Sequence, residues 1–305
     1  MSGDVDLFVF AERLTSARMN EVSGAGPSAP SQGLCEAEEA EPSESGQIRV
    51  EKEFKRPRVT GRPLEPETNP TVPKPLSAIE IIEPDSGLRL EDRKLFNVLL
   101  ALSWDQLIEP RGEEPFHAPA ALLRRAIGQE TATDNRRLRD SLKRLMRTLL
   151  TFPRVLDNGS VNEGVSPLLS MASLPKGQGI VEWEFSRFLK PHLAGPCIWA
   201  RLHLNVCAAF SGKYALILYE LLSIRAGLRF PVWEASVDEL RRYLGVDDKL
   251  SGWDLLSRKA VIPGIEEINL HAPFTVKFEP VAERGSRRIV SVRFTIAMKH
   301  STTGK

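Results

Sequence analysis

The chain of 305 residues repeats one order of predicted elements twice, and this repeat restricts the fold more than any single motif does. Each half begins with an apolar helix, continues through a helix-turn-helix pattern and ends in a β-hairpin pattern. Residues 90–107 and residues 212–226 are the two leading helices. A hairpin that follows a helix-turn-helix is typical of a winged helix. The order therefore predicts an α+β protein with tandem winged-helix domains.

The first half carries recognisable helix ends. Pro119 suits the first position of a helix, and Gly128 suits the position just past its end. In the next stretch Thr133 or Asp134 can cap a second helix. Its apolar residues fall on one stripe, namely Leu138, Leu142, Leu145, Met146 and Leu149. The segments VSPLLSMASL and IVEWEF flank PKGQG, which predicts a hairpin.

The second half repeats these signals. In SVDELRRYLG, Ser236 and Glu239 have capping-box spacing and Gly245 supplies a stop. In the helix that follows, we expect Pro263 to kink or restart the helix and Asn269 to end it in the left-handed conformation. Glu266 and Glu267 point about 100° apart on a helix. We interpret them as helix-end charges that hold neighbouring cations, not as an acid/base couple. FTVKFEPV and RRIVSVRFTI predict the closing hairpin.

Composition divides the chain into an arm and a body. Residues 1–87 are predicted to be a disordered arm and linker, because residues 20–87 are rich in Ser, Gly, Glu and Pro without apolar periodicity. We assign residues 88–200 and 201–300 to the two domains and 301–305 to a tail. Residues 1–53 carry eleven acidic and four basic residues, and the rest of the chain carries 37 basic and 29 acidic ones. An acidic arm on a basic body favours a polyanion partner.

Several other classes are disfavoured. No apolar run approaches the ~18 residues of a membrane span, so we expect no membrane association. The three cysteines form no paired framework, which favours a cytoplasmic location. Cys197, His203 and Cys207 lie close in sequence but lack metal-ligand spacing, and we predict neither metal nor cofactor. Tyr219 has no His pair to serve it, so a DNA-nicking enzyme is the disfavoured alternative and the protein is predicted not to be an enzyme.

Arg and Lys residues are concentrated in the two predicted recognition helices and in the turn of the second predicted hairpin. In the first half the predicted DNA-binding residues are Asn135, Arg136, Arg137, Arg139, Lys143, Arg144 and Arg147. In the second half Arg258 and Lys259 occupy the equivalent helix, and Arg284, Arg287 and Arg288 surround Gly285 in the hairpin turn. A solvated helix face and a charged turn that protects an edge strand are the alternative interpretations. The predicted function is sequence-specific binding of double-stranded DNA.

The same segments resemble a known family. FSGKYALILYELLS, VDELRRYLGV, the run W-x-x-L-x-R-K-x-x-x-P-x-I-E-E-I-N and the strand R-x-I-V-S-V-R-F-T-I resemble the iteron-binding plasmid replication initiators of the Rep family. RKLFNVLLA, HAPAALLRRAIG and SLKRLMRT resemble the first winged helix of one branch of that family. The resemblance spans about residues 90–297. It implies binding to repeated origin sites, opening of the origin, and recruitment of the host initiator and replicative helicase.

The resemblance also implies site residues and assembly states. By position, Ser257, Arg258 and Lys259 fall on the DNA-contacting stretch of the second recognition helix. Two cations that related chains often carry there are missing, and the family's Asp-Pro-Ala is Ile262, Pro263 and Gly264 here. Dimers of such initiators commonly repress their own promoter, so a homodimer through the first domain is expected. A winged-helix transcriptional repressor without an initiator role is the alternative.

A short motif lies in the arm. DVDLF, residues 4–8, resembles the peptide with which some replication proteins bind the sliding clamp, and Leu7 and Phe8 would be its contacts. A short apolar anchor on a flexible arm suits such a ligand. A short helix at residues 5–14 that docks on the body is the alternative.

Overall fold

The structure is a computed structural model that describes residues 71–79, 87–109, 115–129, 134–155, 161–174, 179–194, 199–246 and 249–299. All of these residues belong to one unit of the chain, Val50–Lys305. The predicted arm up to residue 70, including Leu7 and Phe8, and the tail lie outside the described residues. Within the described part, no helix has the length and apolar character needed to cross a bilayer.

The first winged helix is built on a leading helix that is buried around most of its circumference. Its elements are α3 (Leu90–Ile108), β2 (Phe116–Pro119), α4 (Ala120–Ala126), α5 (Arg136–Arg147), β5 (Leu169–Ser173) and β6 (Ile180–Phe185). The predicted end of α4 holds, since Gly128 follows the helix with a φ of 77°, whereas Pro119 is the last residue of β2 and precedes the helix instead of being its first residue. The predicted hairpin pairs β5 with β6 in antiparallel register.

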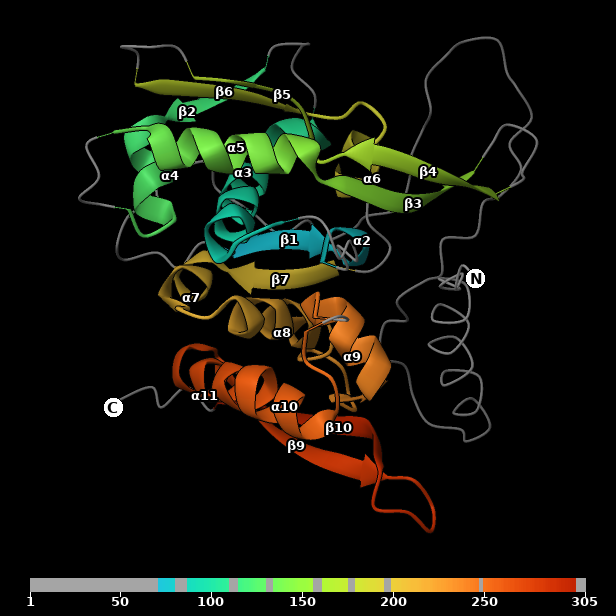
Figure 1. Cartoon of the computed structure of the whole chain (residues 1–305). Coiled ribbons are helices and arrows are strands. Elements are labelled where there is room, and N and C mark those ends of the chain that lie inside the picture. The colour runs from blue at the N-terminus through green and yellow to red at the C-terminus, as the bar shows by residue number, and fades with distance from the viewer. Residues whose placement is uncertain are drawn as a thin grey trace, which may run out of the picture. The chain divides into compact units, whose positions relative to one another are not determined.

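The second winged helix follows the same plan at the C-terminal end of the chain (Figure 1). Its elements are α8 (Lys213–Ser223), β8 (Val232–Ser236), α9 (Val237–Leu244), α10 (Trp253–Leu256), the π-helical turn η1 (Ser257–Val261), α11 (Ile262–His271), β9 (Phe274–Ala282) and β10 (Ile289–Met298). The predicted capping box is present at α9, where Ser236 Oγ accepts from the Glu239 backbone N–H. Gly245 ends α9 in the left-handed conformation, with a φ of 62°.

The two winged helices share one sheet topology, which confirms the predicted tandem architecture. The strand orders are β2-β6-β5 and β8-β10-β9, so in each sheet the strand that precedes the helix-turn-helix pairs with the last strand of the hairpin. Aromatic pairs face each other at equivalent places, Phe116 opposite Trp183 and Trp233 opposite Phe294. Their ring centroids are 6.1 Å and 5.3 Å apart. Cross-strand aromatic contacts of this kind stabilise a sheet register.

Two further strand pairs lie outside the repeat. They are formed by β1 (Thr71–Pro75) with β7 (Trp199–His203) and by β3 (Leu149–Val155) with β4 (Val161–Pro167). β1 falls in the range for which composition indicates a linker, and β7 spans the predicted domain boundary at residue 200. β1 carries buried Val72 and Lys74, and these contacts explain why a segment with two prolines is ordered. The short helices α2 (Leu76–Ile79), α6 (Lys190–Ala194) and α7 (Leu204–Ala209) complete the fold.

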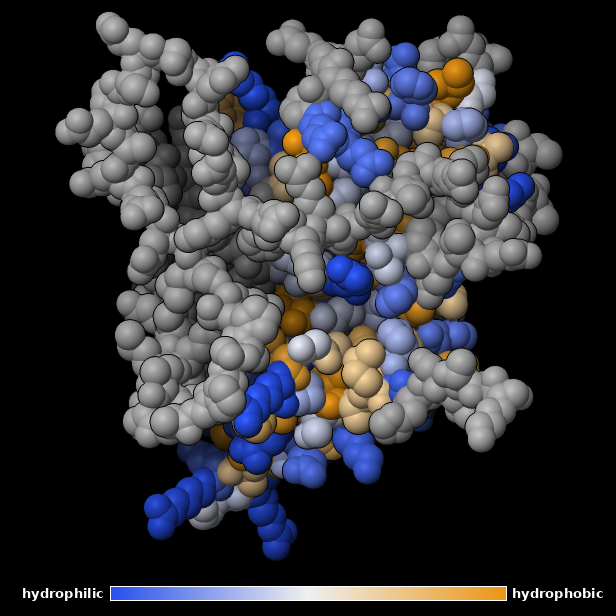
Figure 2. Space-filling view, turned by 180° about the vertical axis from the view of Figure 1, so that it is seen from behind, coloured by the Kyte–Doolittle hydropathy of each residue, from blue (hydrophilic) through white to orange (hydrophobic). Residues whose placement is uncertain are grey.

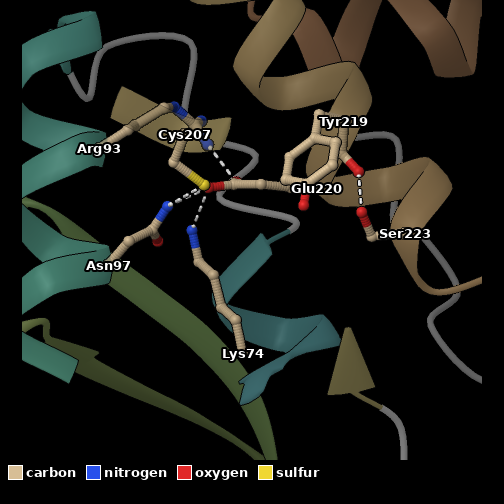
Figure 3. A network of polar contacts seen from close by, with 7 residues as sticks. All are labelled: Lys74, Arg93, Asn97, Cys207, Tyr219, Glu220 and Ser223. Atoms are coloured by element: carbon tan, nitrogen blue, oxygen red, sulfur yellow. Dashed lines mark hydrogen bonds and ion pairs between the residues drawn. The ribbon is translucent and has the colours of Figure 1, made fainter. Parts of the chain in front are cut away.

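A buried polar cluster joins β1, α3 and α8 (Figure 3). Glu220 on α8 is fully buried, and its carboxylate accepts from Lys74 Nζ at 2.9 Å and from Asn97 Nδ2 at 2.8 Å. An Arg93 guanidinium nitrogen lies 3.6 Å from the same carboxylate. Burial lowers the pKa of Lys74, whereas Glu220 raises it. Buried charges of this kind require partners, so the cluster ties the position of β1 to that of α8.

Cys207 lies beside this cluster. Its sulfur accepts from Asn97 Nδ2 at 3.8 Å, and burial raises the pKa of its thiol. Among the described residues no group of His, Cys, Asp and Glu side chains is arranged to bind a metal ion.

Candidate nucleic-acid interface

The first recognition helix, α5, has one apolar face and one cationic face. Leu138, Leu142 and Leu145 are buried and fix the orientation of the helix against α3 and the sheet. The predicted cations on the other side that are exposed are Arg136, Arg137, Lys143 and Arg147, while Arg139 is half-buried. An amphipathic helix of this composition can present charge to a phosphate backbone while its leucines anchor it.

Two of the predicted residues of α5 are engaged inside the protein. The Arg144 guanidinium donates to both carboxylate oxygens of Asp92, with Nε–Oδ2 at 2.7 Å and Nη2–Oδ1 at 2.8 Å. Asp92 is fully buried and also accepts from the Arg89 backbone N–H at the start of α3. The hydrogen bond to Asp92 raises the pKa of Arg144. Asn135 accepts a hydrogen bond from Arg124. Arg144 therefore connects α5 to α3, and Asn135 connects α5 to α4.

The second recognition helix is formed by α10, η1 and α11 in succession. The backbone remains right-handed helical at both junctions, and the π-helical turn ends two residues before Pro263. A proline has no N–H to donate, and a π-helical turn is one way to accommodate the interruption of the i→i−4 pattern. π-helical turns are found frequently at functional sites. This one contains both predicted cations, Arg258 and Lys259.

The three residues predicted on this helix point in two directions. Arg258 and Lys259 are exposed. Ser257 is buried, with 7% of its surface exposed, and its hydroxyl donates to the Asp254 carbonyl. Arg258 Nε donates to the same carbonyl at 3.3 Å, which draws its side chain along the N-terminal part of the helix. The geometry therefore presents the two cations at the surface, whereas Ser257 packs inward.

The C-terminal half of this helix is anchored by polar contacts that sequence patterns do not predict. The Glu267 carboxylate accepts from the backbone N–H groups of Ser211 and Gly212 at 2.7 and 3.3 Å, at the start of α8. A cation does lie near Glu267, since its charge opposes the lowering of the Lys94 pKa by burial, but the hydrogen bonds that anchor Glu267 come from Ser211 and Gly212. Carboxylates are stabilised there by unpaired N–H groups and the helix dipole.

Asn269 has a different role from the predicted one. The helix continues to His271, and no described non-glycine residue has a positive φ, so Asn269 does not end the helix in the left-handed conformation. Its side chain instead bonds both backbone groups of Val276 in β9, accepting at 2.6 Å and donating at 3.0 Å. Lys299 Nζ donates to the Asn269 carbonyl at 2.7 Å. These bonds hold the end of the recognition helix to the hairpin.

The tip of the β9–β10 hairpin is cationic. Arg284, Arg287 and Arg288 are exposed, and Gly285 takes a φ of 77° that permits the tight turn. The turn is closed by the Glu283 N–H, which donates to the Arg288 carbonyl at 2.9 Å. Figure 2 shows hydrophilic side chains projecting where this hairpin ends, at the lower left of the view. Within the described ranges none of these three arginines forms an ion pair with a carboxylate.

The features that sequence reasoning misses are the internal partners. Asp92 stands at the third position of α3, which is a recognisable capping position, but nothing in the sequence indicates its bond to Arg144, 52 residues away. Glu267 is recognisable as a helix-end charge, but its contact with the start of α8 depends on how α8 and α11 pack.

Two recognition helices, each joined to a hairpin, define a winged-helix protein with a duplicated unit. The chain matches the family model described as the initiator replication protein WH1 domain over residues 78–223, and the model described as the initiator Rep protein WH2 domain over residues 236–296. These matches cover more than half of the chain, and the chain belongs to the family of replication initiator proteins. The predicted family is therefore confirmed. The boundary between the matches falls at 223–236, so the family places α8 with the first domain.

One solved structure supports the same fold. The crystal structure of the Pi initiator protein in complex with iteron DNA matches with a TM-score of 0.59 and 17% identity, covering 76% of this chain and 98% of that chain. The WH1 domain of MSBI1.176, a replication protein isolated from a multiple sclerosis patient, matches with a TM-score of 0.30 and 17% identity, covering 37% of this chain and 86% of that chain. The comparison with curated protein sequences found no match.

Proposed function

We propose that this protein initiates plasmid replication by binding repeated double-stranded DNA sites in the origin. The observation that carries the proposal is the exposure of cations at three places of the winged-helix plan, which are α5, the turn η1 and the tip of the β9–β10 hairpin. Recognition helices of this type read base edges in the major groove, and wing cations neutralise phosphates. The similarity to a protein crystallised with iteron DNA supports this assignment.

The proposed mechanism needs binding energy and no chemical step. Two DNA-binding modules in one chain raise each other's effective concentration on adjacent grooves, so the pair binds more tightly than either alone. Origin opening and recruitment of the host initiator and replicative helicase belong to the proposal through the family. A homodimer through the first domain, association with the plasmid in the cytoplasm and a clamp contact through Leu7 and Phe8 also remain proposals.

Footprinting tests the choice of site. We expect the full chain to protect direct repeats in an origin fragment, with a period of about two helical turns, because sites so spaced lie on one face of the duplex. Protection of a lone inverted repeat, with none of the direct repeats, would support a repressor instead. Absence of protection on any duplex would contradict the proposal.

The wing is tested by salt dependence. Replacing Arg287 and Arg288 by Ala should weaken binding to many sequences and reduce the slope of log K against log salt by about 0.9 for each phosphate that the variant no longer neutralises. Fluorescence anisotropy across a salt series measures this slope. Arg293→Ala is the matched control, because Arg293 lies on the same hairpin but is paired with Glu234 at 2.9 Å. An unchanged slope in the double variant would show that the wing does not contact phosphates.

A further inference from the structure

The exposed face of the second recognition helix contains an apolar residue among its cations. Ile262 is 38% exposed, although its neighbour Val261 is fully buried. Ile262 is the first residue after the π-helical turn that holds Arg258 and Lys259, and all three side chains are exposed. Arg258, Lys259, Ile262 and Glu266 are all exposed, whereas Leu256, Ala260, Gly264 and Ile268 are buried. The core-facing side of the helix therefore does not use Ile262.

The direction of the Ile262 side chain brings it closer to Arg258 and Lys259. A helical side chain leans toward the N-terminus and covers the surface over the preceding turn. The preceding turn here is η1, which carries Arg258 and Lys259. A β-branched side chain in a helix has one strongly preferred rotamer, so Ile262 presents its methyl groups in a defined direction. The surface thus combines hydrogen-bond donors with a rigid apolar group.

Cationic donors next to an apolar group are complementary to a guanine and a nearby thymine in the major groove. In the major groove guanine offers the O6 and N7 acceptors to arginine or lysine, and thymine offers its C5 methyl group to an apolar side chain. One helical turn advances about 5.4 Å and bases on one strand are about 3.4 Å apart, so neighbours on the helix reach bases one or two steps apart. A single exposed apolar residue is common on protein surfaces and carries no meaning alone. Ile262 is informative because it lies next to η1, the turn that carries Arg258 and Lys259.

We propose that Ile262 is a specificity-determining residue that contacts a thymine methyl group within two base pairs of a guanine read by Arg258 or Lys259. The proposal rests on the proposed function, since it requires that this helix enters the major groove. Beyond that function, the proposal specifies that Ile262 selects a thymine. Deoxyuridine differs from thymidine by this methyl group alone, so replacing thymine by uracil isolates the contact.

The experiment uses the full chain and a randomised duplex pool. Sequences bound by the wild-type protein are selected, and each thymine of the selected site is then replaced singly by deoxyuridine. We expect one replacement to weaken binding about fourfold, which corresponds to ~0.8 kcal/mol for a buried methyl-sized group. Ile262→Ala should bind the thymine site about fourfold less tightly, and should no longer distinguish thymine from uracil at that position.

Controls on the same helix separate this contact from general effects. Leu270→Ala removes an apolar side chain that is 73% exposed on the same helix, and it should preserve the discrimination. Ile262→Val retains the branched shape and should also preserve it. If Ile262→Ala failed to fold, as judged by circular dichroism, Ile262→Gln would serve, because it replaces the branched apolar group by a polar side chain that also suits a helix. It should likewise lose the discrimination between thymine and uracil.

The failures are distinguishable. If the pool yields no enriched sequence, the proposed function fails, and this inference fails with it. If a site is selected but every thymine tolerates uracil, or if Ile262→Ala still discriminates, the function stands and the contact is overturned.

Discussion

At the scale of residues, one carboxylate links each recognition helix to the leading helix of its winged helix. Asp92 receives two hydrogen bonds from Arg144 and one from the Arg89 backbone, and Glu267 receives the N–H groups that begin α8. Composition and spacing identify Arg144 as one more cation of a DNA-binding face. Its assignment as an internal partner requires knowledge that Asp92 is buried beside it, which is a property of packing.

We predict that Arg144→Ala lowers the free energy of unfolding by about 3 kcal/mol or more, because it leaves the buried Asp92 carboxylate without its charged partner. Urea denaturation followed by circular dichroism measures the change. Lys143→Ala, which removes an exposed cation from the adjacent position, should alter stability by less than about 0.5 kcal/mol. An Arg144→Ala protein of wild-type stability that had lost DNA binding would show instead that Arg144 contacts DNA directly.

At the scale of elements, periodicity predicts the parts that bury one face and misses those whose order comes from distant partners. The helices around Leu95 and Leu216 and both hairpins of the winged helices follow from apolar spacing and turn residues. Strand β1 does not, because two prolines in TVPKP argue against a strand. Its register with β7 depends on buried Lys74 and on Glu220, which is 146 residues away in the chain.

The packing of α11 against α8 gives a test in which two effects oppose each other. A Cβ atom on Gly264 would lie 2.9 Å from Leu218 Cδ1 and 3.4 Å from the Ala215 backbone nitrogen. Helix propensity alone favours Ala over Gly by about 1 kcal/mol. We expect the clash to dominate, so that Gly264→Ala lowers the free energy of unfolding by about 1–3 kcal/mol.

Thermal and urea denaturation of purified Gly264→Ala measure this balance. Gly227→Ala is the control, because a Cβ atom there meets nothing within 4 Å. Increased stability of Gly264→Ala would show that the Leu218 side chain, or the two helices, can move aside at little cost, contrary to the close packing of the structure.

At the scale of the whole molecule, α8 belongs to both winged helices. It contacts α2 and β7 on the side of the first, and α9 and α11 on the side of the second. The boundary predicted at residue 200 assigns α8 to the second domain. Composition can locate a domain boundary only where a linker separates the domains, and here the strand β7 connects the two halves. The family matches assign α8 to the first domain. Each assignment agrees with part of the contacts of α8, because this helix packs against elements of both domains.

Removing β1 tests this arrangement. We predict that a chain beginning at residue 76 is much less stable than a chain beginning at residue 70, because it lacks Lys74 and the five-residue pairing of β1 with β7. Comparing the two by thermal denaturation cancels any effect of residues 1–69. Lys74→Ala in the longer chain should reproduce part of the destabilisation, since Glu220 is then deprived of its closest charged partner. Equal melting temperatures for the two chains would exclude a structural role for β1.

The buried thiol of Cys207 can report local opening of the protein. A thiolate is the reactive form of cysteine, and burial that raises the pKa of this thiol leaves it protonated and shielded from reagents. Alkylation at this position therefore has to wait until the surroundings of Asn97 and Glu220 open. After Cys35 and Cys197 are replaced by serine, the rate at which an added reagent alkylates Cys207 reports how often that opening occurs, on free protein and on DNA.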